Sequence, residues 1–437
     1  MGKSARWTLA VAAGLLVAGV LGYRARRAEQ AEELVQQAER LLHPPLREAS
    51  SWQDVRAGEA RELLEEAQAL AASAVGTALL GEAEVISQLQ HGAYAQAERR
   101  LASLPGAAQN SELLLLRAAA ALALKDTADA QRAIERLSSS AREQPRALLL
   151  RSDLARALGR GDEALAHAAH GIALDDRDAA LYERRGLAYE LLGDWPHARS
   201  DLEHATELEP RGTSALIALG RVLRTMGDLR GAVLAFHAAT QRNPAEAEAW
   251  LGSGVCRAAQ GDDAGARVDL ERASELAPTR AEPLVALADV DVAEGDLASA
   301  LRRYRAAVLL DADGATARVK LGNTLLRSGA IEEAAPAFRG AIERRPDLGA
   351  AHNGLGAALL ARGDLPGAES ELKLAATLDP NDAHPLLNLA RLYKRRGDAA
   401  GFANALAQAE ARDPQLLVAS SAAAARTATA RRVAAPH

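Results

Sequence analysis

Two markers recur along this chain of 437 residues with a common period of 34. The first is a glycine, followed in all but one period by aspartate, at Gly193, Gly227, Gly261, Gly295, Gly329, Gly363 and Gly397. The second is a proline, at Pro210, Pro244, Pro278, Pro346, Pro380 and Pro414, with Ala312 in the remaining place. Two kinds of residue that recur in register indicate supersecondary units that stack on their neighbours, rather than a chain folded around one core.

Small and large apolar residues lie at helical spacing inside each period. Ala198 is followed four residues later by Leu202, and Ala205 follows after three more; a similar trio recurs every 34 residues as far as Ala375. Alanine lets two helices approach closely, and a large residue on the same face fills the groove between them. The glycine can end a first helix, the aspartate can cap a second, and the proline can open the next repeat. Each period is therefore predicted to be a pair of antiparallel helices.

The pattern resembles the tetratricopeptide repeat, in which Leu-Gly and then Tyr mark the first helix, Ala and an aromatic residue mark the second, and a proline comes late. The residues that carry the resemblance include Gly186, Tyr189, Leu219, Gly220, Trp250, Gly254, Leu321, Gly322, Leu355, Gly356, Leu389 and Tyr393. It implies an all-α fold, a right-handed superhelical solenoid of antiparallel helix pairs whose first helices line a concave groove.

The markers divide the chain into regions. Seven regular repeats are predicted over residues 179–416, and degenerate repeats over residues 78–178, where the same markers persist with substitutions. Residues 24–77 are predicted to be a helical connector, because they contain two amphipathic segments. Residues 417–437 are predicted to be a cap helix and a disordered tail.

A run without charge follows the N-terminal tail of residues 1–6. It spans residues 7–23, reads WTLAVAAGLLVAGVLGY and is flanked by basic residues on both sides. These features predict one transmembrane helix before the solenoid, at the short limit for a span. A cleaved secretory signal is the alternative, and it is disfavoured because arginines follow the run directly.

The anchor predicts a single-pass protein of the bacterial inner membrane. The two sides of the run carry nearly equal positive charge. Lys3, Arg6 and the amino terminus precede it, and three arginines follow it between Arg24 and Arg27. A short tail with three positive charges favours an extracytoplasmic body, whereas the arginine cluster favours the opposite orientation. Cleavage would instead give a secreted or periplasmic protein.

Charge and composition argue against several classes of function. The formal net charge of -6 offers no basic excess for nucleic acid. Cys256 is the one cysteine, which excludes Cys-based zinc sites and Fe–S clusters. His167 and His170 lie one helical turn apart, with His204 in the matching place of the next repeat, but no metal-binding motif accompanies them. We predict no metal, no cofactor, no small-molecule substrate and no enzymatic activity, because no stretch outside the repeats could hold a catalytic domain.

A solenoid with an open groove predicts a scaffold or adaptor that binds protein partners. The first hypothesis is a membrane-anchored module that recruits an extended segment of a protein or peptide partner, in envelope assembly or secretion. The alternative is a structural spacer that self-associates within a complex and has no dedicated peptide site. A concentration-dependent oligomer formed without a partner would favour the alternative.

The resemblance also implies which side chains line the groove. In the middle repeats they are mainly apolar: Leu251, Val255, Val285, Val292, Val319 and Leu326. The polar residues expected in the peptide-binding groove are Asn323, Arg327, Asn353, Arg391, Lys394 and Arg395. The basic end suits an acidic segment of a partner. The alternative interpretation is that these cations complement the dipole of the last helical turn.

Overall fold

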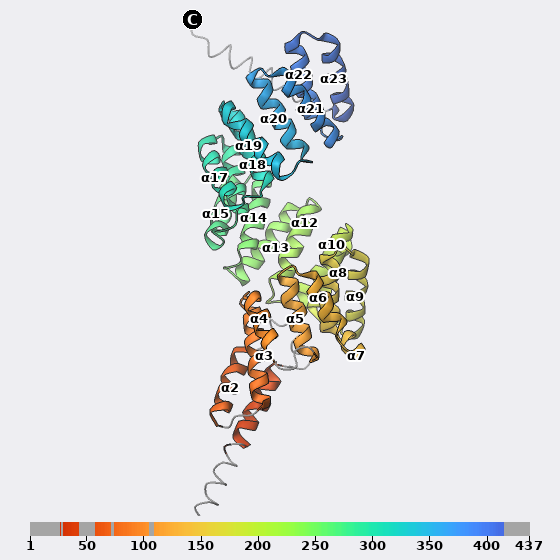
Figure 1. Cartoon of the computed structure of the whole chain (residues 1–437), viewed down its shortest axis with the longest axis vertical. Coiled ribbons are helices and arrows are strands. Elements are labelled where there is room, and N and C mark those ends of the chain that lie inside the picture. Colours follow the sequence, from red (N-terminus) through yellow and green to blue (C-terminus); the bar gives the residue numbers. More distant parts are fainter. Residues whose placement is uncertain (1–26, 28, 43–56, 71–73, 105–108, 415–437) are drawn as a thin grey trace, which may run out of the picture. The chain divides into compact units, whose positions relative to one another are not determined.

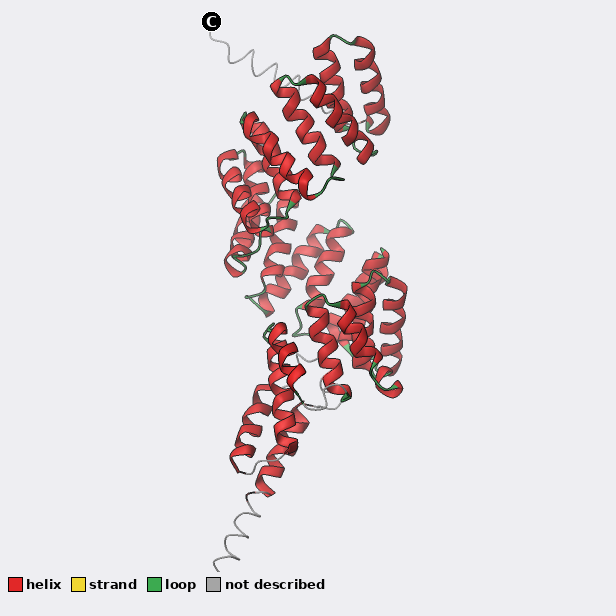
Figure 2. Cartoon of the chain, in the orientation of Figure 1, coloured by secondary structure: helices red, strands yellow, loops and turns green. Residues whose placement is uncertain are grey.

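The computed structural model describes residues 27, 29–42, 57–70, 74–104 and 109–414, and all regular secondary structure in these residues is helical (Figure 1, Figure 2). The chain divides into two compact units between Asp228 and Leu229, here called unit 1 and unit 2. In each unit, helices that follow one another along the chain pack together. The prediction of an all-α solenoid of helix pairs is confirmed.

The first helix described in unit 1 spans residues 29–42, and its apolar face packs with that of the following helix in one buried cluster. Leu42 and Leu64 are both completely buried in it. The helices that follow are α2 (Ala57–Leu70), α3 (Ala74–Gln90), α4 (Tyr94–Ser103), α5 (Ser111–Ala123), α6 (Thr127–Glu135), α7 (Ser139–Arg142), α8 (Pro145–Ala157), α9 (Gly161–Leu174), α10 (Ala179–Leu192), α11 (Trp195–Leu208) and α12 (Ser214–Thr225).

Unit 2 distributes its core along its length. Its helices are α13 (Leu229–Arg242), α14 (Ala247–Gln260), α15 (Asp263–Leu276), α16 (Glu282–Glu294), α17 (Leu297–Leu310), α18 (Ala315–Ser328), α19 (Ile331–Arg344), α20 (Gly349–Arg362), α21 (Leu365–Leu378), α22 (His384–Arg396) and α23 (Ala399–Arg412). One apolar cluster extends from Ala288 of α16 to Ala409 of α23. Each repeat therefore buries its apolar face against its neighbours, as expected of a stack of repeats.

Glycine and aspartate form the turn inside the repeat. Gly261 follows α14 with φ of 81°, in the left-handed region where a side chain is strained. Asp262 then caps α15, because its Oδ1 accepts a hydrogen bond from the Gly265 amide at 3.0 Å. A left-handed glycine also ends α10, α16, α18, α20 and α22. The turn predicted from the glycine markers is confirmed.

Large side chains of the second helices lie against small residues of the first helices. Phe338 of α19 is completely buried, and its ring lies directly over Gly322 of α18 and Gly354 of α20. A Cβ atom on Gly322 would lie only 2.7 Å from Phe338 Cε1, and one on Gly354 would lie closer still. Neither glycine can carry a side chain without displacing the ring, so Phe338 holds three consecutive helices together.

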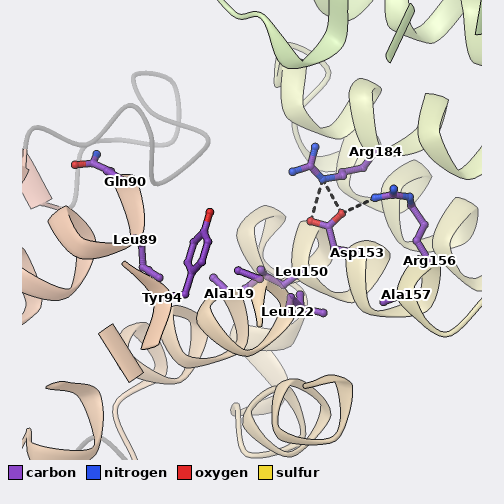
Figure 3. A pocket seen from close by; sticks show the side chains of 11 residues that line it. Leu89, Gln90, Tyr94, Ala119, Leu122, Leu150, Asp153, Arg156, Ala157 and Arg184 are labelled. Carbon is purple, nitrogen blue, oxygen red and sulfur yellow. Dashed lines mark hydrogen bonds and ion pairs between the residues drawn. The ribbon is translucent and has the colours of Figure 1, made fainter. Parts of the chain in front are cut away.

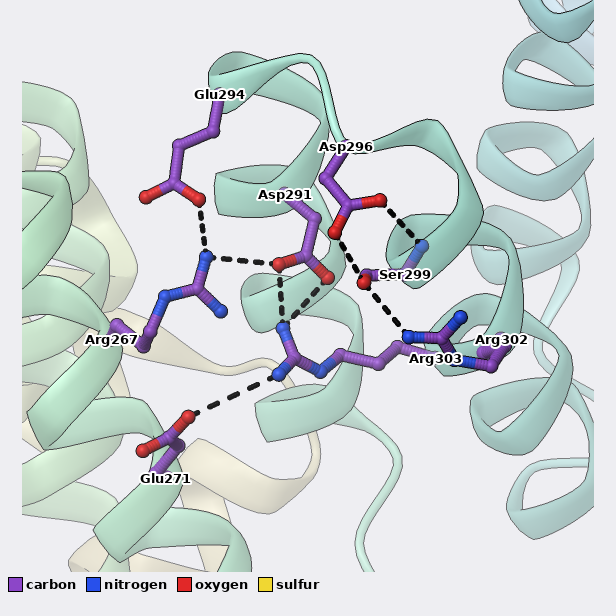
Figure 4. A network of polar contacts seen from close by, with 8 residues as sticks. All are labelled: Arg267, Glu271, Asp291, Glu294, Asp296, Ser299, Arg302 and Arg303. Carbon is purple, nitrogen blue, oxygen red and sulfur yellow. Dashed lines mark hydrogen bonds and ion pairs between the residues drawn. The ribbon is translucent and has the colours of Figure 1, made fainter.

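A buried ion network joins three helices of unit 2 (Figure 4). Asp291 of α16 is 1% exposed. Its Oδ1 accepts a hydrogen bond at 2.9 Å from Arg267 Nη2 of α15, and both of its oxygens accept at 2.7 Å from Arg303 Nη1 of α17. Arg267 also donates to Glu294 at 2.6 Å, and Arg303 lies 3.9 Å from Glu271. The buried charge is tolerated because two guanidinium groups neutralise it.

The place of Asp291 in the repeat is uncharged further along the chain. Leu325, Leu359 and Tyr393 stand one, two and three periods later. The network therefore belongs to one repeat and its predecessor, and it is not part of the shared repeat pattern.

The described helices correct the predicted localisation at a membrane. None of them is both long enough and apolar enough to cross a membrane. The longest helix in the described residues, α3, has 17 residues, which rise about 26 Å against roughly 30 Å of hydrocarbon in a bilayer. This finding contradicts the prediction of a single-pass inner-membrane protein. Residues 7–23, to which the transmembrane helix was assigned, lie outside the described residues, as do residues 1–6 and 417–437.

Candidate functional site

First helices of successive repeats touch one another and form a face in each unit. In unit 1, α3 touches α5, α5 touches α8, α8 touches α10, and α10 touches α12. In unit 2, α14 touches α16, α18 touches α20, and α20 touches α22. We call these faces the inner face of unit 1 and the inner face of unit 2. Side chains on such a face can contact a ligand that runs across several repeats.

Acid–base pairs bridge neighbouring first helices at a sequence separation of 31 residues. Arg184 Nε of α10 donates to Asp153 Oδ2 of α8 at 2.9 Å, and Arg221 Nη2 of α12 donates to Glu190 Oε2 of α10 at 3.0 Å. A separation of 31 residues is one repeat less about one helical turn, so the base lies opposite the acid of the preceding repeat. Sequence reasoning missed these pairs, although a search for acids and bases at this separation would have found them.

The middle of the inner face of unit 2 is apolar with one ion pair. The six apolar side chains expected there are half-buried or buried. Asp289 lies among them and accepts hydrogen bonds from Lys320 Nζ, another pair separated by 31 residues, and from Tyr304 Oη. Burial and the adjacent Asp289 carboxylate raise the pKa of Tyr304 above its ordinary value. Tyr304 therefore stays a hydrogen-bond donor and holds Asp289 in place.

Two of the predicted groove residues, Asn323 and Arg327, are exposed on α18. Within the described residues, neither side chain has a hydrogen bond or an ion pair. The residue that lies 31 positions after Asn323 is Gly354, which has no side chain to bridge the two helices. The Asn323 amide is therefore available to a ligand.

Asn388 links two further predicted groove residues, Asn353 and Arg391. Asn388 Nδ2 of α22 donates to Asn353 Oδ1 of α20 at 2.8 Å, and Arg391 Nη1 donates to Asn388 Oδ1 at 3.0 Å. Arg395 Nη1 donates at 2.6 Å to the carbonyl oxygen of Leu360, near the end of α20. These contacts position Arg391 and Arg395 without a carboxylate partner in the described residues.

Lys394 and Arg396 are both exposed on α22 but differ in their surroundings. Arg396 Nη1 lies 2.8 Å from Glu369 Oε2 of α21, whereas Lys394 has no ion pair within the described residues. Glu369 also accepts hydrogen bonds from Lys373 Nζ at 2.7 Å and from Tyr393 Oη at 3.0 Å. The hydrogen bond from Lys373, then those from Tyr393 and Arg396, lower the pKa of Glu369 to about 2.

The depressed pKa of Glu369 predicts a pH-dependent contribution to stability. The charged carboxylate stabilises the fold above its ordinary pKa of 4.5, and this contribution is lost as the pH falls toward about 2. We expect Glu369→Gln to lower the free energy of unfolding by about 1 kcal/mol at pH 7, because the partners are largely solvated. Urea titrations at pH 7, 5 and 3 should show the gap between wild type and variant narrowing with acid. A gap that stays constant over this range would contradict the ion-pair explanation.

Charge is segregated along the first helices of unit 2. Helix α16 carries Glu282, Asp289, Asp291 and Glu294 and no lysine or arginine. Helices α18, α20 and α22 carry no carboxylate, and their basic residues are Arg318, Lys320, Arg327, Arg362, Arg391, Lys394, Arg395 and Arg396. Lys320, Arg362 and Arg396 are paired with carboxylates of other helices. The five bases without an ion pair in the described residues are Arg318, Arg327, Arg391, Lys394 and Arg395. The charge on the first helices thus changes sign between α16 and α18.

A pocket of about 490 Å³ lies on the inner face of unit 1 (Figure 3). Its apolar lining includes Leu89 of α3, Tyr94 of α4, Leu122 of α5 and Leu150 of α8. Asp153 of α8, with Arg156 and Arg184, lines the other side. No residue of this pocket was predicted from the sequence, because residues lining the groove were assigned only in the regular repeats. The corresponding places of the degenerate repeats include Leu89, Ala119 and Leu122.

The histidines considered for a metal occupy different surroundings. His170 Nδ1 lies 3.3 Å from Glu143 Oε2, and the His204 ring packs edge-on against Tyr182 with the ring centroids 4.4 Å apart. In the ranges that the structure describes, no group of three or more His, Cys, Asp and Glu side chains is arranged to hold a metal ion.

Most of unit 2 and the last residues of unit 1 are similar to a known family of repeats. A tetratricopeptide repeat model matches residues 217–281, 285–348 and 319–383. No curated protein sequence matches this chain significantly.

Solved structures with a similar fold include proteins of low sequence identity. The crystal structure of the APC/C hetero-tetramer Cut9-Hcn1 is 17% identical, with a TM-score of 0.55 over 86% of this chain and 74% of that one. A tetratricopeptide repeat protein from Parabacteroides merdae is 14% identical, with a TM-score of 0.47 over 57% of this chain and 98% of that one. YrrB, described as a TPR protein with an unusual peptide-binding site, is 21% identical, with a TM-score of 0.35 over 42% of this chain and 95% of that one. The likeness to Cut9-Hcn1, at 17% identity, shows the fold alone.

Proposed function

We propose, from the premise that this chain belongs to the tetratricopeptide repeat family, that it is a scaffold that binds protein partners on its inner faces. The fold implies protein or peptide partners. We further propose that binding is its whole activity and that it catalyses no reaction. Its repeats would then serve to place side chains along an extended surface, which is the arrangement that a long partner segment needs.

The proposed partner of unit 2 is an acidic segment with apolar side chains. The observation that carries this proposal is the charge of α18, α20 and α22, which together have eight basic residues and no carboxylate. Arg391, Lys394 and Arg395 lie at one end of the inner face, and the apolar strip around Val319 and Leu326 lies before them. Carboxylates would pair with the guanidinium and ammonium groups, while apolar side chains would cover the strip.

The distribution of unpaired cations on the first helices gives the partner a direction. On α16, Asp289 is paired with Lys320 and Glu282 with Arg280, and the helix carries no lysine or arginine, whereas Arg391 and Lys394 of α22 have no ion pair in the described residues. A segment with its carboxylates at one end would therefore meet attraction at α22 and none at α16. We propose that the acidic end of the partner lies over α22, since the opposite orientation would leave its carboxylates without a cation.

Binding of defined peptides to the whole protein tests this function. The probe is a fluorescein-labelled dodecapeptide in which glutamate alternates with leucine and alanine, and the control replaces every glutamate with lysine. Fluorescence anisotropy should show the acidic peptide binding at least about tenfold more tightly, and weakening as NaCl is raised from about 50 to 300 mM. Equal affinity for the two peptides, or affinity that does not change with salt, would refute an acidic partner on this face.

A further inference from the structure

The pocket on the inner face of unit 1 has a floor suited to a large apolar side chain. Leu89 and Leu150 are 8% and 7% exposed, and Leu122 is half-buried beside them. Figure 3 shows Leu122 and Leu150 between Tyr94 and the ion pair of Asp153, with Leu89 on the other side of Tyr94. Five helices, α3, α4, α5, α8 and α10, supply the lining of the pocket, so it is held open by the packing of the repeats rather than by one loop.

The polar side of the pocket has more hydrogen-bond donors than acceptors. Asp153 accepts from Arg156 Nη1 at 3.0 Å and from Arg184 Nε at 2.9 Å, and Arg184 Nη1 donates to Glu183 at 2.9 Å. Within the described residues, Arg184 Nη2 and the Nε and Nη2 atoms of Arg156 donate no hydrogen bond. Figure 3 shows the free end of the Arg184 guanidinium directed over the cavity toward Tyr94. The rim therefore offers N–H groups to an acceptor on a ligand.

We propose that this pocket is a second binding site, which takes a leucine-sized apolar side chain of a partner segment together with a carboxylate that directly follows it. The apolar side chain covers Leu89, Leu122 and Leu150, and the carboxylate accepts hydrogen bonds from Arg184 and Arg156. The two cations are already opposed by Asp153 and Glu183, so the apolar contact supplies most of the affinity and added salt weakens binding little. This distinguishes the pocket from the basic end of unit 2, where charge dominates.

The pocket of unit 1 and the basic end of unit 2 would bind partner segments of different chemistry. A chain with one salt-sensitive and one salt-insensitive site can hold two different segments at the same time. The pocket does not depend on the function proposed for unit 2, because none of its residues belongs to that unit.

Short peptides that carry a single apolar side chain test the proposal on the full chain. The probe is acetyl-Gly-Gly-Leu-Asp-Gly-amide, followed through the leucine methyl signals of the protein by NMR. The methyl signals of Leu89, Leu122 and Leu150 should shift saturably, and the peptide with glycine in place of leucine should bind at least about tenfold more weakly. Asparagine in place of the aspartate should also weaken binding, because the carboxylate acceptor is lost. Methyl signals that do not respond, or that respond equally to the glycine peptide, would overturn the proposal.

Filling the pocket gives a matched pair of variants. Ala119 of α5 lines the pocket and is half-buried, so Ala119→Trp should occupy the cavity and abolish the methyl shifts. Ala128→Trp on the exposed surface of α6 adds the same side chain outside the pocket and should leave binding unchanged. Retained binding by a folded Ala119→Trp variant would place the peptide elsewhere. The Arg391→Glu, Lys394→Glu variant of unit 2 should bind this probe normally, so failure of either site can be recognised separately.

Discussion

Reversing the charge of Arg391 and Lys394 together is expected to lower the affinity for the acidic dodecapeptide by about 100-fold. Each change to glutamate removes one attraction and adds one repulsion, and four such terms of somewhat less than 1 kcal/mol each amount to about 2.7 kcal/mol. Arg391 is held by Asn388 at 3.0 Å, so its charge has a fixed place on the inner face. Fluorescence anisotropy at low salt gives the affinity, and circular dichroism confirms that the helices remain.

A matched control separates a local effect from a general effect of charge. Arg302 and Arg305 lie three residues apart on α17, as Arg391 and Lys394 do on α22, and both are exposed. The double change Arg302→Glu and Arg305→Glu alters the net charge by the same amount. It does so away from the inner face, because α17 is the second helix of its repeat. This control should retain most of the affinity. If both double variants lose affinity equally, or if neither does, then the basic end of α22 is not the docking site.

Phe338→Ala should lower the free energy of unfolding of unit 2 by about 3 to 5 kcal/mol. The ring is completely buried and lies against Gly322 and Gly354, which have no side chains that could move into the space. The cavity would therefore stay open and three helices would lose their common contact. Urea unfolding gives the loss for the chain, and amide hydrogen exchange locates it, with α18, α19 and α20 expected to exchange faster.

An exposed residue serves as the reference for this truncation. Leu309 is 84% exposed on α17, so Leu309→Ala removes apolar atoms from a side chain that is hardly buried. Its effect should be within about 0.5 kcal/mol. A loss for Phe338→Ala as small as that for Leu309→Ala would show that the ring does not hold these helices together.

The features predicted well from the sequence are those set by local chemistry. The left-handed glycine, the aspartate cap and the buried alanines depend on residues a few positions apart, and each is repeated every 34 residues. Repetition makes such signals readable, because the same requirement appears many times in one chain. The all-helical fold follows from them.

Features that depend on one particular pair of repeats were not predicted. The ion network of Asp291 requires Arg267 and Arg303 from two different repeats, and none of these three residues is part of the repeat pattern. The pocket beside Leu122 lies in repeats whose markers are degenerate, where the groove positions were not assigned. The membrane prediction rested on residues 7–23 and their basic flanks, outside the repeats, and the described helices contradict the localisation drawn from it.

The Asp291 network also limits how the array could change its length. Repeat proteins lengthen and shorten by whole units, and removal of residues 281–314 would keep every marker in register. It would, however, bring Leu325 to the place of Asp291 and Ser328 to the place of Glu294. Arg267 would then lose both of its carboxylate partners at once. The repeat that contains Asp291 is therefore not interchangeable with its neighbours, and the order of repeats around it is fixed by charge.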